Sequence, residues 1–393
     1  MRGKGVGTLG RWRWLTAGES HGPGLVGIVE GVPAGVPLTR ETIDRDLARR
    51  QKGYGRGGRM SIERDAVQIW GGVRHGRTLG SPVALVVPNR DFENWRESMS
   101  PDPGQPDRVV TRPRPGHADL VGGIKYRHRD LRNVLERASA RETTMRVALG
   151  AVARAFLEAV GIRVTGHVLR IGDVAVAERE WSWEALQRAE DSPVRVADPS
   201  VEAEMMARID QAKADGDTLG GVFEVVAFGL PVGLGSYVHW DRRLEGQLAQ
   251  ALISIPAMKA VEVGTGFAQA EKPGSAVHDP IRWTQAHGWE RASNRAGGIE
   301  GGITTGMPLR VRVAMKPLST LMSPLGSVDI ESKEPFLAQV ERSDVTAVPA
   351  ASVVGEAMVL HVLADAVLEK FGGDSLEEVA QRMHQWEQYV RTY

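Results

Sequence analysis

Two histidines stand in surroundings that would hold them rigidly, and both could transfer protons. His21 lies in the run GESHGPG and His117 in the run RPGHAD. Imidazole titrates near neutral pH, and neighbouring arginines disfavour its charged form until an anion binds. A lone histidine is more often structural than catalytic. Here there are two histidines, each in a Gly-Pro turn and near a basic cluster. A role in proton transfer is then as good an interpretation as a structural role.

Arginines gather in two clusters along the chain. The stretch from Thr111 to Arg146 carries nine Arg or Lys against four acids, although the whole chain is formally neutral. It opens on Arg112 and Arg114, which X-Pro pairs hold in extended backbone. Guanidinium groups bind phosphate and carboxylate through paired hydrogen bonds, so the clusters predict a ligand with several anionic groups. For any single arginine the alternative is a solvated surface. The second cluster consists of Arg40, Arg45, Arg49, Arg50, Lys52, Arg56 and Arg59.

A helix start follows His117 in the chain. Ser139 and Glu142 have the spacing of a capping box, and apolar residues recur at helical spacing from Met145 to Val160. A helix N-terminus presents unpaired N–H groups and the positive end of the helix dipole. With Arg137 and Arg141 beside it, this helix start predicts a phosphate site.

Several other kinds of site are excluded by the sequence. The histidines show no spacing such as HExxH and there is no cysteine, so no transition-metal site is predicted. No GxxxxGK[ST] run is present, which removes the commonest ATP-binding loop. GYGRGG at 53–58 has the letters of a dinucleotide fingerprint. A helix is expected before it and the strand-like run 60–63 after it, the reverse of what that motif requires.

The composition is that of an ordinary soluble protein, with 42% hydrophobic and 25% charged residues. We find no run of about 18 apolar residues, so no membrane span is expected. The first residues are basic but lack the apolar core of a secretory signal. The lack of cysteine excludes disulfides and thiolate chemistry and fits a cytoplasmic protein.

The elements that must position these side chains follow from the periodicity of the sequence. We expect a strand and a Gly/Pro turn over 24–38, a helix from Thr39 toward Arg50, and strands at 66–70 and 82–88. The loop 89–110 is long enough for a flap or a subunit contact. The charged segment 176–216 carries no motif and is expected to be peripheral. Further strands are expected at 162–172 and 309–316, and helices through Glu356 to Phe371 and over 375–391.

The pattern of the first sixty residues returns later in the chain. GVPAGV at 31–36 is matched by GLPVGL at 229–234, and each is followed by a helix with leucines at helical spacing. We infer an α+β fold with an internal duplication, in which two similar units of sheet and helix pack with their helices between sheets. Two unrelated units that share common turn residues are the alternative.

RPRPGHAD at 112–119 and RNVLERASARET at 132–143 resemble the central signature of the chorismate synthases. The resemblance implies one domain over 1–393, built as a β-α-β sandwich of long helices between two antiparallel sheets. Residues 1–14, before Leu15, have no counterpart in the family pattern and are treated as an extension without a role. Val345-Thr346 replaces the Pro-Cys of many members, with no expected chemical consequence. The resemblance also covers LTAGESHGP at 15–23, LARRQKGYGRGGRM at 47–60, NRDFENW at 89–95, AGGIEGGITTGMP at 296–308, KPLST at 316–320 and ERSDVTAVPAASVVGEAM at 341–358.

The resemblance implies an activity. Chorismate synthases convert 5-enolpyruvylshikimate 3-phosphate to chorismate by 1,4-elimination of phosphate, in the shikimate pathway to the aromatic amino acids. They require reduced FMN although the reaction has no net redox change, and NADPH is a candidate reductant. The resemblance further implies a homotetramer with no nucleic-acid or membrane partner.

The resemblance also implies roles for individual residues. His117 would be the acid for the departing phosphate, and His21 would lie beside the flavin and donate to its reduced ring. Asp344 would help the flavin take the proton of the substrate. The substrate anions would bind Arg50, Arg56, Arg114 and Arg141. The FMN-binding positions would be Arg137, Ala138, Ser139, Gln250, Ala251, Gly301, Lys316, Pro317, Leu318, Ser319, Thr320 and Arg342.

Two rival functions belong to other classes. A nucleic-acid-binding protein could use the basic stretches 40–64 and 112–146. Zero net charge, few aromatic residues near the clusters and no known binding module argue against it. A flavin reductase with the same flavin seat would consume nicotinamide with turnover.

Overall fold

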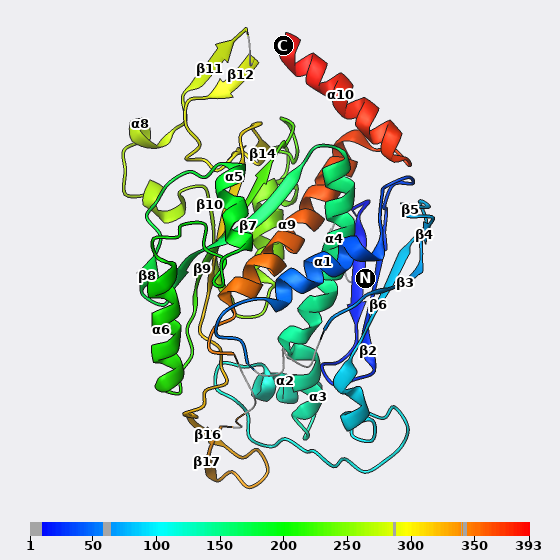
Figure 1. Ribbon diagram of the computed structural model, residues 1–393, viewed down its shortest axis with the longest axis vertical. Helices are drawn as coiled ribbons and strands as arrows, with labels where there is room; N and C mark the ends of the chain where they lie inside the picture. Colours follow the sequence, from blue (N-terminus) through cyan, green and yellow to red (C-terminus); the bar gives the residue numbers. More distant parts are fainter. Residues whose placement is uncertain (1–9, 58–63, 286–287, 339, 341–343) are drawn as a thin grey trace.

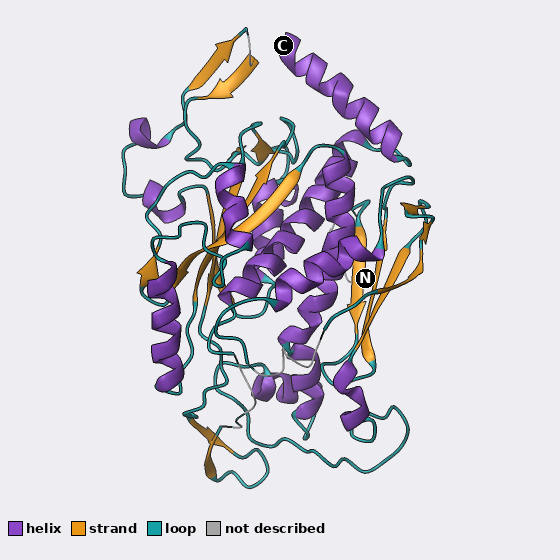
Figure 2. Cartoon of the chain, viewed as in Figure 1, coloured by secondary structure: helices purple, strands orange, loops and turns teal. Residues whose placement is uncertain are grey.

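A computed structural model describes residues 10–57, 64–285, 288–338, 340 and 344–393 of the chain. It has a mixed α+β fold with several antiparallel sheets and long helices, which confirms the predicted class at that level (Figure 2). The strand-like run 60–63 and the site position Arg342 lie outside the described residues.

The first large sheet is antiparallel and alternates buried and exposed residues along its strands. In its second strand every other residue faces the interior, and Leu15 of the first strand pairs with Ile28 of the second. One face of this sheet therefore packs on the core and the other faces outward. Its strand order is β1 (Arg13–Ala17), β2 (Gly24–Glu30), β6 (Val83–Pro88) and β3 (Gln68–Gly71).

The second large sheet is also antiparallel. Its order is β10 (Met258–Val263), β15 (Leu309–Met315), β9 (Gly221–Phe228), β7 (Arg163–Ile171) and β8 (Val174–Ala175). Short two-stranded antiparallel sheets lie within the connecting segments. They are β4 (Val73–Arg74) with β5 (Arg77–Thr78), β11 (Ile281–Thr284) with β12 (Gly288–Arg291), β13 (Ile299–Glu300) with β14 (Ile303–Thr304), and β16 (Gly326–Val328) with β17 (Pro335–Leu337).

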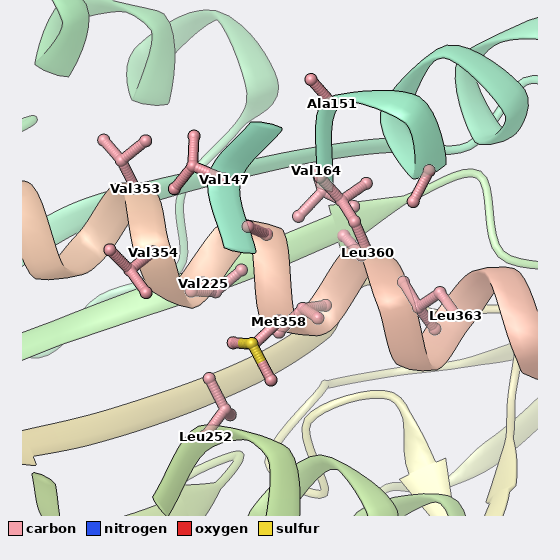
Figure 3. Packing of buried hydrophobic residues seen from close by; sticks show 14 of the residues in the cluster. Val147, Ala151, Val164, Val225, Leu252, Val353, Val354, Met358, Leu360 and Leu363 are labelled. Carbon is pink, nitrogen blue, oxygen red and sulfur yellow. The ribbon is translucent and has the colours of Figure 1, made fainter. Parts of the chain in front are cut away.

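Four helices pack together in the core, each in contact with α9 or forming it: α1 (Arg40–Gln51), α4 (Thr143–Ala159), α7 (Leu244–Ile253) and α9 (Val348–Phe371). Helix α4 contacts β2 of the first sheet and β7 of the second, and α9 packs on α4, β7 and β9 (Figure 1). Val147 and Ala151 of α4 meet apolar side chains of α9 and the second sheet (Figure 3). Burial of this continuous apolar core is the main stabilising term of the fold.

Helix α9 is long and apolar enough to span a membrane by length and hydropathy, although the sequence pattern suggested no such stretch. However, 89% of its most apolar part is buried inside the protein, so it is a core helix. It begins eight residues before Glu356, at Val348.

The remaining helices lie around this core (Figure 1). They are α2 (Asp119–Tyr126), α3 (Arg132–Ala138), α5 (Trp183–Gln187), α6 (Glu202–Ala214), α8 (Gly274–Val277) and α10 (Leu376–Thr392). Single 3₁₀ turns occur at η2 (Arg90–Trp95), η3 (Ala140–Glu142), η4 (Arg188–Glu190), η5 (Trp240–Arg242) and η6 (Gly266–Gln269).

Two segments with no role expected from the sequence carry buried residues. In the N-terminal extension, Trp12 is buried against Phe156 and Arg13 begins β1. The segment 176–216 also contributes to the interior. Its Leu186 is fully buried against Val226 of the second sheet, where a strand face needs an apolar cover.

The expected capping box at Ser139 forms only in part. The Ser139 hydroxyl accepts from the backbone N–H of Arg141 (3.2 Å), and it caps the turn η3 instead of α4 itself. Glu142 does not return to the Ser139 backbone; its carboxylate accepts from Arg146 (2.9 Å), one turn further along. The ion pair between Glu142 and Arg146 thus takes the place of the expected bond between Glu142 and the Ser139 backbone.

Buried His361 predicts an acid-sensitive step in stability. Its Nδ1 accepts from Trp12 Nε1 (3.0 Å), so the neutral ring fits the site, and burial lowers the pKa of His361 to about 4. Because this value lies below that of the unfolded chain, the unfolded state binds the proton first, and stability falls as the pH drops from ~6.5 toward ~4.

We expect His361 to lower the free energy of unfolding by about 2 kcal/mol between pH 7 and pH 5. Urea unfolding of the wild type and of His361→Gln at both pH values measures this contribution. The variant should show a correspondingly smaller pH dependence. Equal pH dependence in the two proteins would contradict the prediction.

Candidate active site

The candidate site residues of the N-terminal half lie at the ends of helices and strands. His21 lies between β1 and β2, Arg50 lies in the last turn of α1, Asn89 directly follows β6, and Arg141 lies in the turn η3 just before α4. Asn89 Nδ2 donates to the carbonyls of Glu19 and Gly22 (3.1 and 2.8 Å), which fixes the loop that carries His21. These elements bring together residues that lie up to 120 positions apart in the sequence.

His21 is held by Glu136 of α3. Its Nδ1 lies 2.8 Å from Glu136 Oε1, and its backbone N–H donates to Glu136 Oε2 (2.8 Å). Burial opposes ionisation of this carboxyl, but the hydrogen bonds from His21 and the charge of Arg132 outweigh burial and lower the pKa of Glu136. An ionised carboxylate only accepts, so Nδ1 carries a proton and Nε2 is the nitrogen that a ligand can meet.

Trp95 covers one face of the His21 ring. The two rings stack with centroids 4.0 Å apart, and the guanidinium of Arg108 lies 4.0 Å from the Trp95 ring centre. Trp95 ends the turn η2, so the loop 89–110 reaches the site. The stack restricts His21 to one orientation.

Arg50 and Arg141 share the buried carboxylate of Asp65. Arg141 Nη1 lies 2.6 Å from Asp65 Oδ1, and Arg50 Nη1 lies 3.8 Å from Asp65 Oδ2. Arg141 also donates to Asn89, and Arg50 to the Thr143 hydroxyl. Burial lowers the pKa of Arg50 to about 10. The charge of Asp65 opposes this shift, and repulsion from Arg56 and Arg141 adds to it. Two buried guanidinium groups therefore meet at one carboxylate with Arg56 nearby, a concentration of positive charge that suits an anionic ligand.

His117 forms a second histidine–carboxylate pair. Its Nδ1 lies 2.6 Å from Asp119 Oδ1, and Arg114 Nε donates to Asp119 Oδ2 (2.9 Å). Burial opposes ionisation of Asp119, but hydrogen bonds from His117 and Arg114 hold its pKa well below its usual range. Arg114 Nη1 also donates to the Thr320 hydroxyl (3.1 Å). This pairing joins the His117 loop to the segment 316–320.

Asp344 lies against the loop that follows α1. Its Oδ2 lies 3.0 Å from Arg56 Nη1, and its Oδ1 accepts from the Gly57 backbone N–H (2.6 Å). Arg56, far away in the sequence, is thus a partner of Asp344.

Most of the residues that were expected to bind flavin lie near the histidines and arginines described above. Arg137 of α3 donates to the carbonyls of Gly18 and Thr16 (3.1 and 3.0 Å), and Ala138 follows it in the same helix. The Ser139 hydroxyl lies 3.2 Å from that of Ser20. Gln250 and Ala251 end α7, and Ser254 links that end to Arg146 of α4 (2.9 Å).

The segment 316–320 faces the His117 loop. A Cβ built on Gly116 would lie 3.6 Å from Lys316 Nζ and 3.7 Å from Ser319 Cβ. Lys316 Nζ donates to the Pro317 carbonyl, and Leu318 accepts from Thr218 (2.8 Å). Burial and the nearby charge of Lys259 lower the pKa of Lys316. No carboxylate within the described residues pairs with Lys316, so this cation suits an anionic ligand.

Gly301 is the one described flavin position that is set apart. It lies in the turn between β13 and β14. Figure 1 shows β14 toward the end of the molecule that carries α10, whereas α2 and α3 lie at the opposite end. Within one chain, Gly301 does not join His21 or His117.

Five further residues complete the site and were not predicted: Asp65, Asn89, Trp95, Asp119 and Glu136. Asp119 could have been found, because it follows His117 by two positions in an otherwise basic stretch. Glu136 and Asp65 carry no local signal, because each is an isolated acid whose partner lies far away in the sequence.

Three comparisons place this chain among known proteins. The family model described as chorismate synthase matches residues 12–368. The chain is 57% identical to the chorismate synthase of Geobacillus thermodenitrificans over 387 residues, which is 97% of this chain and 100% of that protein. It is 59% identical to that of Moorella thermoacetica over 380 residues, which is 96% of this chain and 99% of that protein. A crystal structure of chorismate synthase matches with a TM-score of 0.79 and 46% identity, over 97% of this chain and 99% of the other.

Proposed function

The chain belongs to the chorismate synthase family, and from that premise we propose how its own residues perform the reaction. It has chorismate synthase activity in the shikimate pathway and is a lyase that acts on a phosphate. The family implies 5-enolpyruvylshikimate 3-phosphate as the substrate. The reaction breaks one C–O bond and one ring C–H bond and forms one C=C bond, with no net change in oxidation state.

Four arginines bind the anionic groups of the substrate in this proposal: Arg50, Arg56, Arg114 and Arg141. The observation that carries it is the meeting of buried Arg50 and Arg141 at Asp65, with Arg56 close enough that burial, and then the charges of Arg56 and Arg141, lower the pKa of Arg50. A phosphate and two carboxylates would offset these charges, which would otherwise be costly to bury together. Each guanidinium already has one side fixed by a protein partner, which limits the rearrangement needed on binding.

His117 is the acid for the leaving phosphate. Asp119 holds Nδ1 of the ring (2.6 Å), which leaves Nε2 for the substrate oxygen. The ionised Asp119 stabilises the charged imidazole, so His117 can be protonated although Arg114 lies beside it. The proton at Nε2 then passes to the departing group.

The family uses reduced FMN, and the residues present suit this cofactor. Lys316, which has Lys259 nearby and pairs with no carboxylate in the described part of the chain, would hold the phosphate of FMN. Arg137 to Ser139, Gln250, Ala251 and the segment 316–320 supply the remaining contacts. When bound there, reduced flavin would supply an electron or a base to the elimination.

His21 and Asp344 hold protons beside the flavin in this proposal. Glu136 holds Nδ1 of the His21 ring, so Nε2 is left to face an anionic group and donates to it when the ring is doubly protonated. Asp344 accepts or relays the proton that leaves the substrate, and Arg56 and the Gly57 N–H hold its carboxylate in place. Arg342 is a further proposed flavin contact, and Gly301, set apart within one chain, would contribute only from another subunit. NADPH as the reductant and a cytoplasmic location remain predictions.

We propose that the protein is a homotetramer. The outward face of the first sheet exposes large apolar residues, among them Leu15 (73% exposed), Trp70 (72%) and Ile28 (45%). A contiguous apolar sheet face is typical of a surface that another subunit covers. Light scattering should give about four times the mass of the 42.7 kDa chain. A monomer at micromolar concentration would contradict the proposal.

We also propose that the two large sheets and their helices arose by internal duplication into a β-α-β sandwich. The order β1-β2-β6-β3 in the first sheet corresponds to β7-β9-β15-β10 in the second. In the first half, α1 comes after β2 and α4 comes after β6. In the second half, α7 comes after β9 and α9 comes after β15.

The turns of the two halves share an unusual hydrogen-bond pattern. Val36 N–H donates to the Thr78 hydroxyl (2.9 Å), and Leu234 N–H donates to the Thr304 hydroxyl (2.8 Å). Each threonine hydroxyl in turn donates to a proline carbonyl, of Pro33 or Pro231. Such agreement supports a common origin over two unrelated turns. A superposition in which the paired strands followed different paths would contradict it.

Arg50→Lys tests the substrate site. Lysine keeps the charge but loses the planar fork of donors, so we expect a loss of about 1.5 to 2 kcal/mol in substrate affinity, with FMN affinity unchanged. Calorimetric titration with 5-enolpyruvylshikimate 3-phosphate measures this loss. Arg40→Lys is the matched control, because Arg40 lies on the same helix with a largely exposed side chain. Equal, small effects in both variants would return Arg50 to a structural role.

The rival functions gain no support. Arginines of both basic stretches, including Arg49, Arg114 and Arg141, turn inward to buried carboxylates instead of outward to a polyanion. A flavin reductase would need nicotinamide consumption with each turnover, whereas the elimination proposed here needs none.

A further inference from the structure

A short loop joins the two arginines Arg50 and Arg56. Lys52 ends α1, and Gly53 and Gly55 have positive φ angles of 136° and 80°, so the backbone takes two turns that other residues would strain. A glycine-rich loop has many accessible conformations when nothing holds it. The relative position of the two guanidinium groups therefore depends on what fastens this loop.

Tyr54 fastens the middle of the loop to the segment 188–214. Its hydroxyl lies 2.9 Å from each carboxylate oxygen of Asp210 on α6, and its backbone N–H donates to the Pro193 carbonyl (2.7 Å). Next to it, a Cβ on Gly55 would lie 2.8 Å from Ile209 of α6. The loop thus lies directly on this helix.

The other side of the loop is fastened to the segment that carries Asp344. The Gly55 carbonyl accepts from Val345 N–H (2.8 Å), and Gly57 N–H donates to Asp344 (2.6 Å). The loop is therefore a bridge between α6 on one side and Asp344 on the other. The Asp344 segment thus holds one side of the loop, and Tyr54 holds its middle.

The segment under Tyr54 is itself anchored to α1. Glu190 accepts from Arg49 (2.9 and 2.5 Å) and from Arg195 (2.9 and 3.0 Å). Arg49 and Arg195 both also bind Glu356 of the core helix α9. Arg49 directly precedes Arg50, so the same buried ion network holds the support of Tyr54 and the helix end that carries Arg50.

We propose that Tyr54 is a positioning residue for substrate binding: its bonds to Asp210 and Pro193 set the distance between Arg50 and Arg56. The inference rests on the substrate site proposed above. The bond from Tyr54 to Asp210 is exposed, and such bonds contribute little to global stability. Its loss should therefore be measured as weaker binding of the substrate without unfolding.

Tyr54→Phe and Asp210→Asn, alone and combined, test this role. Phenylalanine keeps the ring and the backbone bond and removes only the hydroxyl. We expect the dissociation constant for 5-enolpyruvylshikimate 3-phosphate to rise about three- to tenfold in Tyr54→Phe. The double variant should bind the substrate no more weakly than Tyr54→Phe, because both changes remove the same Tyr54–Asp210 hydrogen bond. FMN affinity and kcat at saturating substrate should stay within about twofold of the wild type. The melting temperature should stay within about one to two degrees.

Asp173→Asn is the matched control. Asp173 holds the same helix α6 through Arg208 (2.8 Å) and does not touch the loop, so its loss should leave substrate affinity unchanged. Unchanged substrate affinity in Tyr54→Phe would overturn the inference. So would a parallel loss of FMN affinity and melting temperature. If Arg50→Lys binds substrate normally, the proposed site itself fails; if only Arg50→Lys is weakened, the site stands and the role of Tyr54 fails.

Discussion

His117→Ala is expected to lower kcat by roughly two to four powers of ten, because it removes the proton donor for the leaving phosphate. Substrate and FMN affinities should change much less, because Arg114 keeps its bonds to Asp119 and Thr320. Stopped-flow measurement of chorismate formation with reduced FMN, together with flavin titration, checks both expectations.

Two companion variants sharpen the His117 prediction. Asp119→Asn removes the charge that stabilises the protonated ring, so its kcat should also fall, with a lower apparent pKa in the pH profile. His384→Ala is the control, because His384 is an exposed residue of α10. Full activity of His117→Ala would remove His117 from the chemistry.

Asp344→Asn is expected to lower kcat by roughly two to four powers of ten with flavin still bound. The amide keeps the size of the side chain but cannot accept the proton of the substrate. Pre-steady-state turnover and a flavin binding titration on the same protein measure the two effects separately.

The ion pair with Arg56 offers a second reading of Asp344, and the same experiment separates the two. If Asp344 only anchors Arg56 (3.0 Å), the variant should bind substrate weakly and turn over normally at saturation. Such a result would contradict proton transfer by Asp344. Asp374→Asn, a change at an almost fully exposed carboxylate, should leave both quantities unchanged.

Local signals were sufficient for much of the secondary structure. Thr39 caps α1 as predicted, since a hydroxyl followed by a helical run is a strong short-range signal. The alternation in β7 likewise predicted a strand. At Ser139 the local rule was incomplete, because Glu142 had a competing partner in Arg146.

Side-chain partners across the fold could not be predicted in the same way. The sequence marked His21 and Arg141 as site residues, but not Glu136 and Asp65, which hold them. Both acids are isolated in the sequence and become partners only when α3 and the β-sheet loops meet. The role of residues 12–14 was missed because burial of Trp12 depends on α4 and α9, far along the chain.

The most direct test of the account is the number of chorismate molecules formed per reduced FMN under anaerobic conditions. The reaction has no net redox change, so a flavin that participates must be regenerated in each cycle. We predict many product equivalents per flavin, with no nicotinamide consumed beyond the initial reduction. One product per flavin, or product formation that requires stoichiometric NADPH, would contradict the account.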